Sequence, residues 1–143
     1  MISEKVMLGE IDGKNSQRLK QIADAFKKAG FPVDISKNID AWKRCHVALV
    51  GPFANAVYMA GSCNYRLAQN KEAVKKTVHA IREGLNVIRA NGFPIEPSVL
   101  KYAIALPDFI IVPMFQKKLG TKLMDIGGAR HSVNAREEVI QLS

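Results

Sequence analysis

The chain has 143 residues, of which 48% are apolar and 24% are charged. These values exclude a disordered chain, and the length suffices for one domain with a buried core. The formal net charge of +8 predicts a surface that attracts anions. The basic residues are not interleaved with aromatic residues and no nucleic-acid-binding motif is present, so nucleic acid is not an expected partner.

Cysteine and histidine are sparse. Cys45 and Cys63 are too few for a disulfide scaffold, and both lie in apolar surroundings. The histidines at positions 46, 79 and 131 have no second His or Cys at ligand spacing. The sequence therefore predicts buried thiols and no metal site.

No segment has the pattern of a membrane span. The first ten residues lack the apolar core of a signal peptide. The two most apolar stretches, 47–60 and 104–115, are interrupted by Gly, Pro, Asn or Asp. We expect both stretches to lie in the core of a cytoplasmic protein that has no membrane partner.

The first forty residues predict a β-α-β unit. Apolar runs at 6–11 and 31–36 favour short strands. Between them, Asn15 or Ser16 is expected to cap a helix that Gly30 ends.

A long helix is expected next, with Asp40 as its cap. Between Val47 and Ala60 it is apolar on nearly all sides, which indicates a central, buried helix. Because proline lacks an N–H and crowds the preceding turn, Gly51 and Pro52 predict a kink or a break.

A third helix, from about Asn70 to Ala90, carries apolar residues at 4-3-4-3 spacing: Val74, Val78, Ile81, Leu85 and Ile88. Such a stripe packs either in the chain's own core or in a dimer seam, and core packing is the favoured use. Glu72 and Lys76 are spaced to pair across one turn.

Short helices are expected in the last third of the chain. Ser98 is predicted to cap one of them, and a second over 108–118 is predicted to stop at Gly120. A last helix starting at Thr121 passes the glycine pair 127–128. The pair weakens this helix locally and is typical of a close approach by a backbone or a ligand.

The motifs of common catalytic sites are missing. The sequence contains no Gly-x-Gly-x-x-Gly, no Gly-x-Ser-x-Gly and no His-Glu-x-x-His. Segment 9–15 has one residue too few between its glycines for a phosphate-binding loop. Glu137 and Glu138 are neighbours on a helix and point about 100° apart, so they do not form a carboxylate dyad. No cofactor-binding residue is predicted.

Together these elements predict a mainly α protein: a β-α-β piece over 1–38 and a helical domain over 39–143. Segments 8–13 and 30–33, followed by Asn38-Ile39-Asp40-Ala41-Trp42-Lys43-Arg44, resemble the ketopantoate reductase (2-dehydropantoate 2-reductase) family. The resemblance runs from the trailing edge of the family's Rossmann domain into its C-terminal domain. It implies a helical bundle like the 6-phosphogluconate dehydrogenase C-terminal domain.

The family transfers a hydride from NADPH to a 2-keto acid in pantothenate biosynthesis. Its glycine-rich nucleotide motif precedes the part that resembles this sequence. The resemblance therefore implies that this chain alone binds no cofactor and is inactive. It also implies a homodimer or a Rossmann-domain partner, and a small 2-keto acid as substrate.

Candidate catalytic residues follow from the same resemblance. The family has a general-acid lysine two positions after the helix-opening tryptophan, where this sequence has Arg44, with Lys43 beside it. Arginine stays protonated, so Arg44 is a poor proton donor but can hold a carboxylate with two hydrogen bonds. The family's two asparagine positions hold Ala48 and Pro52, which makes Asn55 the candidate replacement.

Thr121 and Glu137 are the remaining candidate substrate-binding residues, in place of a serine and a glutamate that the family has near its C-terminus. The departures from the family pattern leave a second function open. In that alternative the chain is a non-enzymatic helical module for oligomerisation or partner binding.

Overall fold

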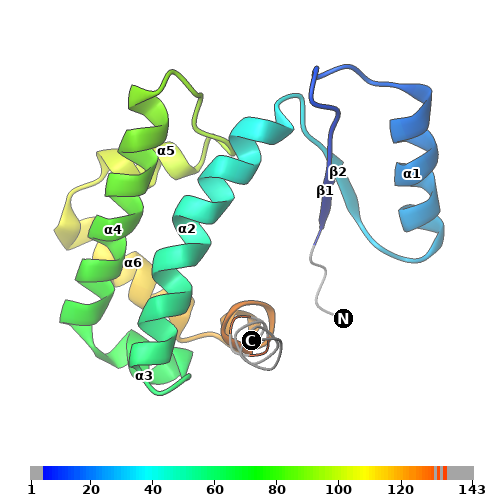
Figure 1. Cartoon of the computed structure of the whole chain (residues 1–143). Helices are drawn as coiled ribbons and strands as arrows, with labels where there is room; N and C mark the ends of the chain where they lie inside the picture. The colour runs from blue at the N-terminus through cyan, green and yellow to red at the C-terminus, as the bar shows by residue number, and fades with distance from the viewer. Residues whose placement is uncertain (1–4, 131, 133, 135–143) are drawn as a thin grey trace, which may run out of the picture.

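The computed structural model describes residues 5–130, 132 and 134. The chain is mainly helical, with a short parallel strand pair near its N-terminus (Figure 1). The first unit consists of β1 (Val6–Leu8), α1 (Gln17–Lys28) and β2 (Val33–Ile35). The helical part consists of α2 (Ile39–Met59), α3 (Asn64–Gln69), α4 (Lys71–Ala90), α5 (Leu100–Ala105), α6 (Asp108–Leu119), α7 (Lys122–Met124) and the π-helical turn η1 (Asp125–Ala129).

The β-α-β unit has the predicted order, and its two strands pair in parallel. Helix α1 begins where Ser16 Oγ accepts a hydrogen bond from the Leu19 amide at 3.0 Å. It ends before Gly30, whose φ of 86° is one that glycine adopts without a steric penalty. Each strand has only three residues, fewer than the apolar runs predict.

Helix α2 lies between the β-α-β unit and α4 (Figure 1). Its cap is Asn38, whose Oδ1 accepts from the Ala41 amide at 3.0 Å, and not the expected Asp40, which lies in the first turn. The helix continues through Pro52 without the break that the sequence allowed. Phe53 and Val57, which follow Pro52 in α2, are buried in the core, and this packing offsets the missing N–H.

The apolar stripe of α4 is buried, as core packing requires. Val74, Val78, Ile81 and Leu85 are each at most 4% exposed. They pack in two clusters together with α2 residues such as Phe53. This confirms the prediction of core packing, and the stripe is therefore not available as a dimer seam.

Two glycines allow the helices to approach closely. A Cβ on Gly84 of α4 would lie 3.0 Å from the Cβ of Ala48 on α2. A Cβ on Gly128 in η1 would lie 3.1 Å from carbons of the Phe53 ring. The group that lies close to Gly128 is thus a side chain, the Phe53 ring, and not the backbone or ligand that the glycine pair was expected to mark.

The two most apolar stretches are only partly buried, contrary to the expectation. In 47–60 the side chains of Val47 and Met59 are 70% and 90% exposed. In 104–115 only Val112 is fully buried, and Phe109 is 77% exposed. Hydrophobicity alone does not identify the inner face of a helix that is apolar all round.

Helix α3 was not predicted, and buried polar contacts hold it in place. Asn64 Nδ2 donates to the carbonyls of Leu119 at 2.7 Å and Thr121 at 3.4 Å. Gln116 Nε2 donates to the carbonyl of Ala68 at 2.8 Å. These contacts fix α3 against the end of α6.

Helix α5 begins at Leu100 with Val99 at the cap position, so Ser98 is not the cap that the sequence predicts. In the described part of the chain, every helix is too short or too polar to span a bilayer.

Candidate functional site

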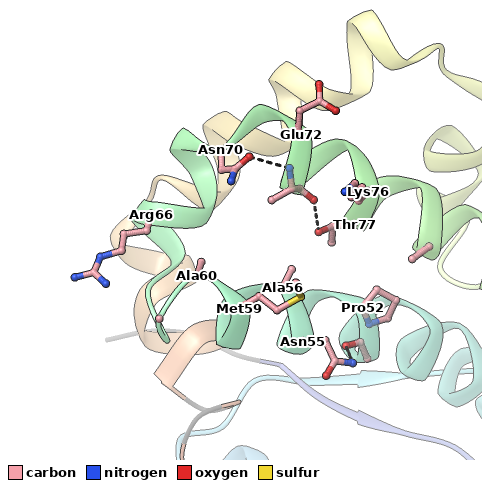
Figure 2. Close-up of a pocket in the computed structure, with 14 residues that line it drawn as sticks. Pro52, Asn55, Ala56, Met59, Ala60, Arg66, Asn70, Glu72, Lys76 and Thr77 are labelled. Atoms are coloured by element: carbon pink, nitrogen blue, oxygen red, sulfur yellow. Dashed lines mark hydrogen bonds between the residues drawn. The ribbon is translucent and has the colours of Figure 1, made fainter.

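A groove of about 1140 Å³ lies between α2 and α4, beside α3 (Figure 2). Small side chains line much of it, namely Ala56, Ala60, Ala73 and Ala80. The side chains of Pro52, Met59 and Thr77 also line it. The groove accordingly offers an apolar surface about two helical turns long.

The polar side chains in the groove mostly serve the helices themselves. Thr77 Oγ1 donates to the Ala73 carbonyl at 2.8 Å, and Asn70 Oδ1 accepts from the Ala73 amide at 3.0 Å. Asn55 Nδ2 donates to the Gly51 carbonyl at 3.1 Å. The predicted residue Asn55 therefore lines the groove, and its Oδ1 is not engaged by a described residue.

Charged side chains stand at the rim. Arg66 extends away from the groove (Figure 2), with its Nη1 only 2.8 Å from the position that a Cβ on Gly61 would take. Within the described ranges, Arg66, Glu72 and Lys76 form no ion pair, so the expected Glu72–Lys76 pair is absent. The rim thus carries two cations and one carboxylate that have no ion-pair partner in the described chain.

Arg44 lies near the start of α2, where its guanidinium group contacts two other side chains. Its Nε donates to Asp40 Oδ2 at 2.9 Å, and its guanidinium carbon lies 4.1 Å from the centre of the Phe93 ring. Both terminal Nη groups are without a hydrogen-bond partner among the described residues. Lys43 is exposed beside it. The sequence gives no sign of the part played by Phe93, which follows α4, 49 residues from Arg44.

Arg44 and Asn55 share one face of α2. They are eleven residues apart, which on an α-helix is three turns and about 16 Å. Between them, Ala48 packs on Gly84, while Pro52 lines the groove. An asparagine at position 48 would therefore displace α4, so this position serves helix packing in this chain.

Thr121 is not brought to this face. Its Oγ1 donates to the Lys118 carbonyl at 2.8 Å and accepts from the Met124 amide at 3.4 Å, which makes it the cap of α7. Glu137 lies outside the described residues. Arg44, Lys43 and Asn55 are thus on the same helix, but Arg44 and Asn55 are about 16 Å apart and only Asn55 lines the groove. Thr121 lies at the end of α6.

A second recess, of about 440 Å³, lies where β2 leads into α2. Residues 34–38 line it together with Trp42, Glu96 and Pro97. The Trp42 ring also stacks on His46, with a centroid separation of 4.8 Å. Recesses at the carboxyl ends of parallel strands are common ligand positions, a rule that could have pointed to this one from the β-α-β pattern.

Asp108, at the start of α6, contacts several basic side chains. It is hydrogen-bonded to His79 Nε2 at 2.7 Å and accepts from Arg82 Nη1, and these bonds lower the pKa of its carboxyl group. Arg82 Nε also donates to the Ala103 carbonyl at 2.8 Å. The cluster ties α4 to the segment around α5, and its members are too far apart in sequence to be predicted.

Within the described ranges, no three His, Cys, Asp or Glu residues are placed to hold a metal ion. No protein-family model, no curated protein and no solved structure matches the chain.

Proposed function

We propose that this chain is the helical, substrate-contacting domain of a ketopantoate-reductase-like, NADP-dependent oxidoreductase that acts in the cytoplasm. Its helical part would correspond to the 6-phosphogluconate dehydrogenase C-terminal-like fold. One observation carries the proposal: only residues 36–38 separate the parallel strand β2 from α2, the helix with Arg44 on it. Parallel strands with a helical crossover are the building units of dinucleotide-binding sheets.

The cofactor would come from outside this chain. In segment 9–15 the Lys14 amide donates to Asp12 Oδ1 at 3.1 Å, and a Cβ on Gly13 would lie 2.6 Å from the Lys37 carbonyl oxygen. This turn is closed by its own groups and carries a carboxylate, so it does not fit a phosphate. NADPH, bound by another domain, would supply the hydride.

This chain's own contribution is to bind and orient an anionic substrate. Arg44 and Lys43 place two positive charges near the start of α2. Asn55 is about 16 Å from Arg44, too far for one small 2-keto acid to contact both, so the proposed substrate site rests on Arg44 and Lys43. Because an arginine is a poor proton donor and the cofactor would be bound by another domain, the chain by itself is expected to bind substrate without reducing it.

Titration of the purified chain with ketopantoate, followed by amide NMR, tests this proposal. We expect resonances at the start of α2 to shift, and we expect no oxidation of NADPH in the same mixture. Absence of any binding, or NADPH-dependent turnover by the chain alone, would contradict the proposal.

A second function, a helical module for oligomerisation or partner binding, is favoured by the outer face of α6. Phe109, Ile110 and Met114 are 77%, 38% and 57% exposed there, beyond what scattered surface residues need. Light scattering at high protein concentration tests the self-association form of this function. A strict monomer would count against it and against the expected homodimer.

A further inference from the structure

We propose that Arg44 is a preoriented carboxylate-binding residue, and that Phe93 is a positioning residue that holds its guanidinium for that purpose. The ligand class, a 2-keto acid, rests on the proposed function. The way the guanidinium is held does not, because it follows from contacts within this chain.

The hydrogen-bonding capacity of Arg44 is only partly used. Asp40 takes the Nε–H at 2.9 Å, and the Phe93 ring covers the guanidinium at 4.1 Å. The two Nη groups have no partner among the described residues, and together they form the planar fork that binds both oxygens of a carboxylate. The free end of the side chain thus matches the geometry of one carboxylate.

Two elements distant in sequence converge on this guanidinium. Gly92, with a φ of 81°, turns the chain after α4, and the Phe93 amide donates to the Ile88 carbonyl at 3.2 Å. This closure places the Phe93 ring against α2. An ordinary ion pair between Asp40 and Arg44 across one helical turn would need no ring from another element.

Holding the side chain in advance strengthens binding. A free arginine loses rotamer freedom when it grips a ligand, and a side chain that is already held loses less. The side chains of Asp40 and Arg44 are both 47% exposed, so the fork remains open to solvent and to a ligand.

The charge balance around the fork favours an anion. Asp40 neutralises one side of Arg44, while Lys43 beside it is exposed and has no ion-pair partner in the described chain. The role of Arg44 in this proposal is to orient a substrate and not to give it a proton. A ligand without a carboxylate should therefore bind poorly.

The test compares ketopantoate with its uncharged lactone, titrated into the full chain while the backbone amide signals at the start of α2 are followed by NMR. We expect ketopantoate to bind at least about tenfold more tightly than the lactone, as a charge-assisted pair of hydrogen bonds implies. Arg44→Gln should abolish that preference. Lys101→Gln removes another exposed positive charge and serves as the matched control, which should retain it.

Phe93 is tested by two substitutions. Phe93→Leu keeps an apolar side chain and should weaken ketopantoate binding about two- to fivefold without changing lactone binding. Phe93→Tyr keeps the ring and should restore wild-type affinity. A purely structural role would change both ligands alike.

The outcomes separate this inference from the function on which it rests. Ketopantoate binding that survives Arg44→Gln, or that is equal for Phe93→Leu and the wild type, overturns the inference and leaves the proposed function standing. Failure of the wild-type chain to bind ketopantoate overturns both.

Discussion

The β-α-β unit and the helical bundle differ in how completely their apolar side chains are buried. Among its described residues the bundle has two buried clusters, one around Leu67 and Leu119 and the other around Cys45 and Leu85. Helix α1 buries only Leu19 and Ala23, while exposed apolar side chains remain nearby: Ile22, Phe26 and Phe31. A two-stranded parallel sheet is rarely stable alone and is normally covered on both faces. The bundle thus holds itself together, and the unit depends on neighbours.

Truncating a core leucine of the bundle should have the largest effect. Leu85 is 0% exposed and packs against Cys45, Ile81 and Ile95. Leu85→Ala leaves a cavity and should lower the free energy of unfolding by about 2–5 kcal/mol. Urea denaturation followed by far-ultraviolet circular dichroism measures this loss.

The same truncation in the β-α-β unit is the matched control. Leu19 is also buried, at 4% exposed, but its surroundings form a much smaller core. Leu19→Ala should speed amide exchange in α1 and leave the unfolding free energy of the bundle within about 0.5 kcal/mol of the wild type. Equal losses in both regions would show that the two unfold as one unit.

Substitution of a glycine in each region should have a smaller effect. Gly84→Val places a branched side chain where even a Cβ lies 3.0 Å from Ala48, and should cost the bundle about 1–3 kcal/mol. Gly30 has open space around it but a φ of 86°, so Gly30→Ala strains the backbone of the β-α-β unit alone. We expect a shifted urea midpoint for the first variant and faster exchange confined to α1 and β2 for the second. A shifted urea midpoint for Gly30→Ala would contradict the difference between the two regions.

Element order could be predicted from the sequence because helical periodicity and turn residues are local signals. The stripe through Val74 and Leu85 predicts the core face of α4, and Gly30 predicts the end of α1. Local signals fail where two residues compete for one role, as at the start of α2, where Asn38 caps the helix instead of Asp40. They also fail at α3, which is held by side-chain bonds to α6 that no sequence window contains.

Of the candidate site, only the arrangement of residues on a single helix could be predicted from the sequence. Arg44 and Asn55 lie on one face of α2 because eleven residues make three turns. The contact of Phe93 with Arg44 and the packing of Gly84 on Ala48 join separate elements. Such contacts depend on how helices are placed in space, which periodicity does not determine.

Lowering the pH should destabilise the two regions over different pH ranges, because each region contains its own hydrogen-bonded carboxylate. Hydrogen bonds from Arg18 and Ser16 hold the pKa of Glu10 below its ordinary value of 4.5. In the bundle, bonds with His79 and Arg82 hold the pKa of Asp108 below 3.8. A carboxylate whose pKa is lower in the folded state contributes stability above its unfolded pKa, and that contribution is lost as pH falls through the folded value.

The losses should therefore begin below pH 4.5 for the β-α-β unit and below pH 3.8 for the bundle. Glu10→Gln should remove the acid dependence of amide exchange in α1 and leave urea unfolding of the bundle unchanged. Asp108→Asn should remove the acid dependence of urea unfolding of the bundle and leave amide exchange in α1 unchanged. Both effects should be small because each network has a partner exposed to solvent, Arg18 in one and His79 in the other, where water and salt screen charges. If Glu10→Gln also changed the acid response of urea unfolding, the bundle would be drawing stability from the β-α-β unit, and the conclusion that the bundle holds itself together would be wrong.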